Sequence, residues 1–330
     1  MIKIAFCGFY KHFDPYVQPI SKIILDNYDT EICDLSHADY VLYSVFDEKH
    51  WFAPDTSIKI FYTGENITPD FNACDYAIGF DYISLGDRYL RYPLYYTYSD
   101  ITELMENKHR QAFNGIRSTK EQFCSITISN DKRAPIFKTL YSKLSEYKQV
   151  DSGGQWMNNI GGKVKDKFSF DKKHKFSIVC ENSASPGYTT EKLIQAFAAN
   201  CIPIYWGDPE VGKVFNTKAF INVPDYASVE EVAELVKKID TNDALYEEML
   251  KQPALVNDCF CKEKQVQQLQ MFLDNIFLQP KELVMRRNRI FWGRKYIEMR
   301  QIQAKRAKSC IYASYWKEKV KTLFSTLKKQ

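Results

Sequence analysis

The stretch from Phe176 to Gly207, FSIVCENSASPGYTTEKLIQAFAANCIPIYWG, decides the fold of this chain. Two short apolar runs within it, 176–180 and 201–206, are rich in β-branched and aromatic residues, as buried strands are. Between them, apolar residues from Leu193 to Ala198 recur at helical spacing. Strand, loop, helix and strand in this order predict a βαβ unit. The loop after its first strand, 181–188, then lies at the carboxyl edge of a parallel sheet, where open α/β folds bind ligands.

The helix of this unit is predicted to begin at Thr189 or Thr190, because either side chain can cap it. Its first turn presents unpaired backbone N–H groups, which attract anions such as phosphate together with the helix dipole. Lys192 adds a positive charge beside them. The segment therefore predicts a diphosphate site. A capped helix in which Glu191 favours the dipole and Lys192 is solvated explains this segment alone equally well.

The rest of the chain also alternates strand-like and helical segments, and its 330 residues have room for two domains. We expect a first α/β domain over 1–117, a second over 118–280 and a helical tail over 281–330. The predicted strands outside the βαβ unit are 2–7, 40–46, 58–63, 76–79, 123–129 and 220–223, and the predicted helices are 16–27, 135–147 and 229–239.

Several blocks of the sequence share a known pattern at fixed spacing. Together they resemble the α-1,3-fucosyltransferases of glycosyltransferase family 10, in the same order and over roughly residues 55 to 225. The blocks are Phe61–Asn66, Asp75–Asp81 and Arg88–Tyr96, then Glu181–Ser183, Thr189–Lys192 and Ile202–Gly207.

The resemblance implies a GT-B fold, in which two Rossmann-like α/β domains face each other across a cleft. Residues 1–117 would bind the acceptor and residues 118–280 the donor GDP-fucose. The implied reaction is inverting transfer of L-fucose to the O3 hydroxyl of N-acetylglucosamine in a lactosamine-type acceptor. A related enzyme that uses another nucleotide sugar is the first alternative, and a non-catalytic surface-binding protein with a basic tail is the second.

The resemblance also assigns roles to residues of the first domain. Glu65 follows the predicted strand 58–63, so it lies at a carboxyl strand end, and it matches the proposed general base of the family. Tyr62 and Asn66 would position the sugar or the carboxylate. Without the resemblance, a glutamate in a loop is more often solvated or capping.

In the second domain, the family pattern places Asn182, Tyr188, Glu191 and Lys192 around GDP-fucose. Lys192 would face the diphosphate, and Glu191 would bind fucose hydroxyls and favour positive charge at the reacting carbon. Glu181 would act similarly from the strand end, or would order the loop by a hydrogen bond.

One position departs from the family pattern. Phe137 stands where the family carries an arginine that grips the diphosphate, and phenylalanine cannot bind phosphate. Arg133 is the first candidate to replace that cation, and Lys138 is the second.

Motifs for other cofactors are missing from the sequence. It contains no Asp-x-Asp triplet, which argues against a metal-bridged nucleotide-sugar site, and no Gly-x-Gly-x-x-Gly or Walker loop. We therefore expect transfer without a metal or other cofactor. The nine cysteines are odd in number and form no C-x-x-C pair, which is typical of free thiols in a reducing compartment.

The charge is distributed unevenly along the chain. Residues 281–330 carry 15 Lys and Arg against 3 Glu, whereas the remainder is acidic, which argues against a protein-wide nucleic-acid-binding surface. Apolar residues from Tyr312 to Leu327 recur at helical spacing and predict a basic amphipathic helix for an anionic membrane surface. A helix that docks on the acidic body is the alternative. We expect no signal peptide and no membrane span, and hence a cytoplasmic protein peripheral to the inner face of a bacterial membrane.

Overall fold

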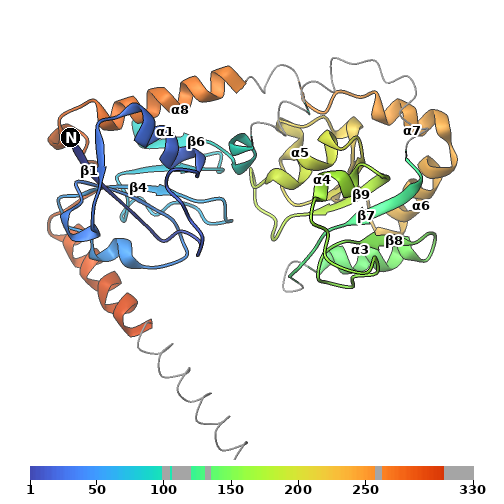
Figure 1. The fold of residues 1–330 in the computed structure, drawn as a ribbon, viewed down its shortest axis with the longest axis horizontal. Helices are drawn as coiled ribbons and strands as arrows, with labels where there is room; N and C mark the ends of the chain where they lie inside the picture. Colours follow the sequence, from blue (N-terminus) through green and yellow to red (C-terminus); the bar gives the residue numbers. More distant parts are fainter. Residues whose placement is uncertain (99–104, 106–119, 131–134, 257–261, 308–330) are drawn as a thin grey trace, which may run out of the picture. The chain divides into compact units, whose positions relative to one another are not determined.

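The computed structural model describes residues 1–98, 105, 120–130, 135–256 and 262–307. These residues form two compact units, which are coloured along the chain in Figure 1. Unit 1 contains residues 1–78, 85–90 and the described residues from 272 onward, and unit 2 contains 79–84 and 91–271. Each unit is built around its own β-sheet.

Unit 1 has a six-stranded sheet with the order β2-β1-β3-β4-β5-β6, and the pairs from β2 to β5 are parallel. Its central strands are buried on both faces, as the apolar runs of the sequence predict. The helix α1, Pro19–Asn27, begins later than predicted, because Pro19 occupies its first turn and the Gln18 side chain accepts a hydrogen bond from the Ser21 N–H at 2.8 Å. The strands are β1 Ile2–Cys7, β2 Thr30–Ile32, β3 Tyr40–Tyr43, β4 Ile58–Tyr62, β5 Tyr76–Gly79 and β6 Tyr89–Arg91.

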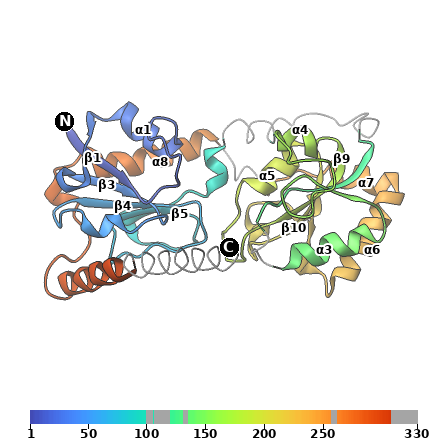
Figure 2. The same cartoon turned by 60° about the horizontal axis from the view of Figure 1, so that its bottom comes forward.

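The helix α8, Lys262–Phe277, returns the chain to unit 1. The ring of Phe277 packs against Tyr28 and Tyr40, with centroid distances of 4.8 and 5.0 Å. Figure 2 shows α1 and α8 on one side of this sheet and the helix 292–307 on the other. The sheet of unit 1 is therefore covered by residues from both ends of the chain.

The segment after α8 docks on acidic side chains of unit 1. Asp75 is fully buried, and its carboxylate accepts the backbone N–H groups of Arg286 and Arg287 at 2.9 and 3.0 Å. Arg286 also pairs with Asp87 at 2.6 Å, and Val284 is fully buried. The described residues 281–307 therefore belong to unit 1 and do not form a separate tail.

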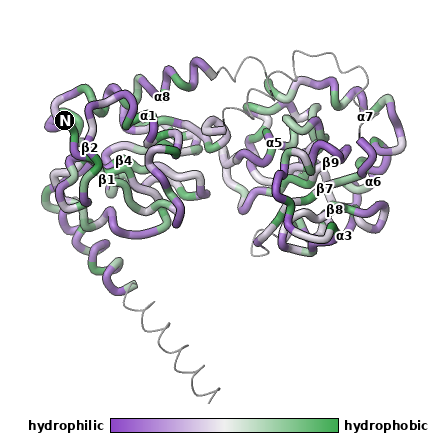
Figure 3. Tube along the Cα trace, in the orientation of Figure 1, coloured by the Kyte–Doolittle hydropathy of each residue, from purple (hydrophilic) through white to green (hydrophobic). Residues whose placement is uncertain are grey.

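The helix 292–307 ends the described part of the chain. Its residue Ala304 packs in a small buried cluster with Trp51 and Ala73. Hydrophobic and hydrophilic residues alternate along it in Figure 3. The predicted amphipathic helix from Tyr312 to Leu327 lies outside the described residues.

Unit 2 has a five-stranded sheet with the order β11-β10-β9-β7-β8, and its neighbouring strands pair in parallel. The strands are β7 Gln122–Ile126, β8 Val150–Ser152, β9 His174–Cys180, β10 Ile202–Trp206 and β11 Ile221–Asn222. The helices are α3 Ile136–Ser145, α4 Lys167–Asp171, α5 Glu191–Ala198, α6 Val229–Thr241 and α7 Asp243–Leu250.

Alternate residues of β9 point to opposite faces of this sheet. Ile178 packs in the core that contains Phe137 of α3 and Val232 of α6, whereas Val179 packs in the core that contains Leu193 of α5. Helices thus cover both faces, and the predicted βαβ unit of β9, α5 and β10 is confirmed.

The boundary between the units also lies earlier than the expected position at residue 117. Phe80 packs against Tyr188 with a centroid distance of 5.0 Å, and the fully buried Tyr95 packs against Phe215 at 5.6 Å. These aromatic contacts join 79–84 and 91–98 to unit 2. Sequence alternation alone could not reveal such contacts, because each joins residues more than 100 positions apart.

Candidate active site

The first feature of the site is the carboxylate that follows β9. Glu181 is fully buried; its Oε1 accepts the Thr190 backbone N–H at 2.8 Å, and its Oε2 accepts Lys192 Nζ at 2.6 Å. The helix α5 begins at Glu191, and its N-cap residue is Thr190, one of the two residues predicted to start the helix. The Thr190 hydroxyl does not cap, because it donates to Glu181 at 2.8 Å instead. Glu181 therefore orders the loop and also fixes Lys192.

A glycine makes room for this carboxylate. A Cβ atom at Gly207, just after β10, would lie 2.5 Å from Glu181 Cγ and 2.7 Å from the Tyr205 hydroxyl oxygen. No side chain tolerates such distances without displacement of its neighbours. The glycine that ends this βαβ unit is thus required by the position of Glu181.

A second buried carboxylate holds the loop before α5. Asp208 Oδ1 accepts the Gly187 N–H at 2.8 Å, and its Oδ2 accepts the Thr189 hydroxyl at 3.1 Å. Gly187 has a positive φ of 85°, which favours glycine. Burial raises the pKa of Asp208, although these donors oppose the shift. The sequence analysis did not propose Asp208. Its position two residues after the end of β10, at the carboxyl edge of the sheet, could have indicated it.

A cavity of about 140 Å³ opens at the carboxyl ends of β7 and β9. It brings together Glu191 and Lys192, both predicted, with Thr127, Lys167 and Gln195, none of which the sequence analysis proposed. Its remaining lining residues are Ile128, Ile178, Val179 and Cys180. A parallel sheet places ligand sites at this edge, but no residue of the predicted ligand loop 181–188 lines this cavity.

Two other residues predicted to bind the donor, Asn182 and Tyr188, lie in the loop between β9 and α5 but do not line this cavity. Asn182 is half-buried, and its side-chain oxygen is buried without a hydrogen-bond partner among the described residues. Such an atom costs free energy unless a ligand or water pairs with it. Tyr188 is only 2% exposed, with its ring edge-on to Phe80. Its ring therefore supports the loop from inside unit 2.

The position of Phe137 explains why it cannot replace an arginine. Phe137 is fully buried, and its ring packs edge-on against Trp156 at 4.9 Å. Lys138 is exposed and is not among the residues that line the cavity. Arg133 lies outside the described residues, so its predicted role stays a prediction.

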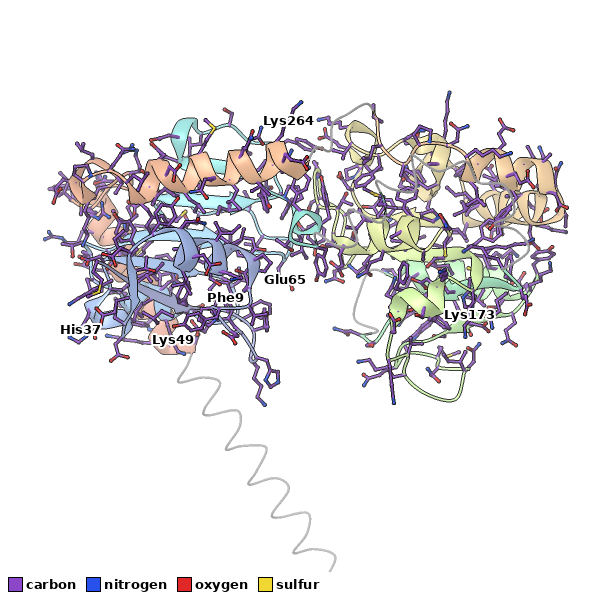
Figure 4. All side chains as sticks on the ribbon, turned by 45° about the horizontal axis from the view of Figure 1, so that its top comes forward. Phe9, His37, Lys49, Glu65, Lys173 and Lys264 are labelled. Carbon is purple, nitrogen blue, oxygen red and sulfur yellow. The ribbon has the colours of Figure 1, made fainter. Side chains whose placement is uncertain are left out.

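In unit 1, the predicted catalytic segment follows β4. The Glu65 backbone N–H donates to the Thr63 hydroxyl at 3.1 Å, and the Glu65 side chain is partly exposed. Tyr62 is buried at the end of β4, and Asn66 is partly exposed. Figure 4 shows Glu65 and Phe9 at one end of unit 1 and His37 at the other. Glu65 thus lies at the carboxyl edge of its sheet.

Within the described ranges, no group of three or more His, Cys, Asp and Glu side chains is arranged to hold a metal ion. No helix in the same ranges is long and apolar enough to span a bilayer.

Two protein-family models match the chain. Residues 4–98 match the N-terminal domain of alpha-(1,3)-fucosyltransferase FucT, and residues 117–272 match the C-terminal region of glycosyltransferase family 10, the fucosyltransferases. Together they account for most of the chain.

Individual proteins agree with these models. Alpha-(1,3)-fucosyltransferase FucT of Helicobacter pylori is 38% identical over 221 residues, which are 58% of this chain and 46% of that protein. A putative fucosyltransferase of Acanthamoeba polyphaga mimivirus is 32% identical over 268 residues, which are 76% of this chain and 41% of that protein. The chain spans less than half the length of both relatives.

Solved structures support the same relationship. A crystal structure of an alpha1,3-fucosyltransferase with GDP-fucose has a TM-score of 0.67 and 28% identity, over 83% of this chain and 90% of that one. Another crystal structure of an alpha1,3-fucosyltransferase has a TM-score of 0.73 over 88% of this chain and 93% of that one. The predicted GT-B fold class is confirmed by the two parallel α/β sheets and by these neighbours. The chain therefore belongs to the fucosyltransferases of glycosyltransferase family 10.

Proposed function

We propose that this protein transfers L-fucose from GDP-fucose, with inversion, to the O3 hydroxyl of N-acetylglucosamine in a lactosamine-type acceptor. One observation carries the proposal: Glu191 and the Glu181-bound Lys192 meet at a cavity beside the first turn of α5, in a member of a fucosyltransferase family. A related structure with 28% identity was solved with GDP-fucose, which supports the donor.

The donor site supplies groups that suit a nucleotide diphosphate sugar. The first turn of α5 presents backbone N–H groups, and Lys192 places an ammonium beside them, so both favour the charge of the diphosphate. The side-chain oxygen of Asn182, which has no hydrogen-bond partner in the described part of the chain, is an acceptor that suits a sugar hydroxyl or a guanine N–H. Tyr188 would hold the loop in place for these contacts.

The reaction that we propose exchanges one bond at the fucose C1 atom for another. The acceptor O3 forms a bond to C1 while the bond between C1 and the phosphate oxygen breaks, and GDP leaves with the electron pair. Glu65 takes the proton of the acceptor hydroxyl. Glu191 binds fucose hydroxyls and favours positive charge at C1 in the transition state. Tyr62 and Asn66 would orient the acceptor and the base.

We propose that this transfer needs no metal ion. Lys192 and the N–H groups of α5 compensate the leaving group, and the sequence has no Asp-x-Asp triplet. The test is turnover after chelation. Activity that EDTA leaves unchanged supports the proposal, and activity that returns only with added Mg²⁺ or Mn²⁺ contradicts it.

We also propose that the C-terminal segment binds an anionic membrane surface. The described residues 281–307 dock on unit 1, so the lipid-binding part of the expected tail is restricted mainly to 308–330. One described feature adds to it: Ile290, Phe291 and Trp292 are 71, 80 and 68% exposed, close to Arg294 and Lys295. Exposed apolar and aromatic residues beside cations suit a membrane interface, here the inner face of a bacterial membrane.

A donor screen tests the proposed reaction directly. The purified full chain is incubated with GDP-fucose, GDP-mannose or UDP-galactose, each with and without N-acetyllactosamine, and nucleotide release and product linkage are measured. Acceptor-dependent GDP release from GDP-fucose alone, with an α-1,3 product, supports the proposal. Turnover of another donor supports the alternative of a different nucleotide sugar. No turnover of any donor, with retained vesicle binding, supports the non-catalytic alternative.

A further inference from the structure

We infer that Lys167 is a second cation of the donor's diphosphate site and that Thr127 contributes a hydroxyl to the same site. The inference rests on the proposed use of a nucleoside diphosphate donor. Phe137 stands where the family pattern has an arginine, and Lys167 would supply the cation that is missing at Phe137. Lys167, Thr127 and Lys192 all line the same cavity of unit 2.

Lys167 is held in the same way as Lys192. Its Nζ donates to Asp171 Oδ2 at 2.6 Å, and the side chains are 28 and 1% exposed. Lys192 pairs with Glu181 at the same distance, with 18 and 0% exposure. In both pairs a buried carboxylate fixes an ammonium that remains partly accessible. The Asp171 carboxylate is itself anchored, because its Oδ1 accepts the Ser125 hydroxyl at 2.7 Å.

The ion pairs leave N–H groups for a ligand. Each ammonium has three N–H donors. Lys192 uses two of them, on Glu181 and on the Thr190 hydroxyl oxygen at 3.1 Å. Among the described residues, Lys167 has one hydrogen-bond acceptor, Asp171. The two lysines therefore keep three N–H donors between them at one cavity wall. The buried carboxylates also lessen the repulsion between the lysines when no anion is bound.

Thr127 gives an independent indication of a missing partner. It follows β7 directly, and its hydroxyl oxygen is buried without a hydrogen-bond partner among the described residues. A buried hydroxyl without a partner is costly, and Thr127 lines the cavity, so a ligand that comes within reach of this oxygen would remove that cost. A hydroxyl donor and ammonium donors together fit phosphate oxygens, which accept hydrogen bonds only.

The cavity lies where the diphosphate of a donor would be expected. Its wall includes residues at the carboxyl ends of β7 and β9 and in the first two turns of α5. Lys167, as the first residue of α4, adds a cation from a fourth element. Lys138 does not line this cavity.

The experiment measures nucleotide affinity by calorimetry on the full chain. The variants are Lys167→Met, which removes the ammonium; Lys167→Arg, which keeps a cation; and Lys165→Met, a matched control because Lys165 is exposed two residues away and is not in the cavity. The ligands are GDP, GMP and UDP.

We expect Lys167→Met to weaken GDP binding at least tenfold and GMP binding less, because GMP lacks the second phosphate. Lys167→Arg should lose at most about threefold, and Lys165→Met at most about twofold.

Thr127→Val gives a test that does not depend on the ion pair. The valine removes an unpartnered hydroxyl, so the melting temperature without nucleotide should rise or stay the same while GDP affinity falls several-fold. A purely structural hydroxyl would give a lower melting temperature. Should Lys167→Met fail to fold, Lys167→Gln takes its place, because the amide removes the charge but can still donate a hydrogen bond to Asp171. GDP affinity within twofold of the wild type in both Lys167→Gln and Thr127→Val overturns the inference.

The outcomes separate this inference from the proposed function. If the wild-type chain binds UDP but not GDP, the donor proposal fails, and the effect of Lys167→Met on UDP still decides the role of Lys167. If GDP binds to the wild type and equally well to folded Lys167→Met, the inference fails and the proposed function stands. A wild-type chain that binds neither nucleotide at millimolar concentration overturns both.

Discussion

Lys192 and Glu181 form an ion pair of 2.6 Å. The Glu181 carboxylate is fully buried and also accepts the backbone N–H of Thr190, the residue just before α5. The pair links α5 to the end of β9. Lys192 therefore has a structural role in addition to its proposed role at the diphosphate, and the two roles can be separated by experiment.

Lys192→Met should destabilise the protein, because it leaves the Glu181 charge buried without its cation. We expect a loss of about 3 kcal/mol in the free energy of unfolding. The double variant Lys192→Met with Glu181→Gln should recover most of that loss, since a neutral amide still accepts the Thr190 N–H. GDP affinity should remain low in both variants. Urea unfolding and calorimetry measure the two quantities, and recovery of GDP affinity in the double variant would contradict the binding role.

Gly207→Ala should damage the site from a position outside the cavity. The added methyl group would meet Glu181 Cγ at 2.5 Å and the Tyr205 oxygen at 2.7 Å, so Glu181 must move. We expect a loss of about 2 kcal/mol in stability and a clear loss of GDP affinity. Gly212→Ala is the matched control, because its methyl group would meet only Thr217, at 3.4 Å. Equal effects of the two substitutions would rule out this explanation of Gly207.

Glu65→Gln should lower turnover by about a hundredfold or more, because the amide cannot accept the proton of the acceptor hydroxyl. GDP affinity should change less than twofold, since Glu65 has no proposed contact with the nucleotide. Glu31→Gln, at an exposed glutamate of the same unit, serves as the control. Steady-state rates with GDP-fucose and N-acetyllactosamine decide the point. Turnover close to the wild-type rate would remove Glu65 as the base.

The stability of unit 1 should depend on pH through Lys59. This lysine of β4 is fully buried, its ammonium has no hydrogen-bond partner among the described residues, and burial lowers its pKa from 10.5 to about 7, with help from the nearby Arg287. Between these pKa values the unfolded chain binds more protons than the folded one, so stability should rise by about 1 kcal/mol per pH unit from pH 7 to 9. Lys59→Met should be more stable at pH 7 and should lack this rise. Urea unfolding at pH 7, 8 and 9 measures both effects, and identical slopes for wild type and variant would refute the role of Lys59.

Truncation after Arg306 should reduce binding to vesicles that contain phosphatidylglycerol at least fivefold, because it removes the predicted basic amphipathic helix. The melting temperature should stay within about 2 °C of the wild type, since the docked residues Gln301 and Ala304 remain. A truncation after Pro280 is unsuitable, because it removes the buried Val284 and Arg287. Vesicle sedimentation with phosphatidylcholine as the control gives the measurement. Unchanged sedimentation with anionic vesicles would end the membrane proposal.

The sequence was sufficient for the features that depend on local pattern. The apolar run before Glu181, the helical spacing after Thr190 and the second run up to Trp206 predicted β9, α5 and β10 within two residues at each end. Local order was informative there because strand and helix periods are properties of neighbouring residues. The start of α1 was missed by three residues, because Pro19 and the Gln18 side chain set it.

Features that depend on distant residues could not be predicted in this way. Asp75 binds the backbone of Arg286 and Arg287 more than 200 positions away, so charge counting correctly found a basic segment but not its place in unit 1. Lys167 reaches the cavity because α4 packs beside α5, and nothing in its own neighbourhood marks it. Asp208 accepts hydrogen bonds from Gly187 and Thr189, which lie 21 and 19 positions before it in the sequence.

The interleaved order of the two units along the chain has a consequence for synthesis. Unit 1 needs Phe277, Val284 and Arg287 to complete its core, whereas all of unit 2 precedes residue 272. On the ribosome, unit 2 can finish folding while the sheet of unit 1, which carries Glu65, still lacks its last covering helix. A nascent chain that has emerged from the ribosome only as far as Pro280 should thus hold a folded unit 2 and an unfinished unit 1.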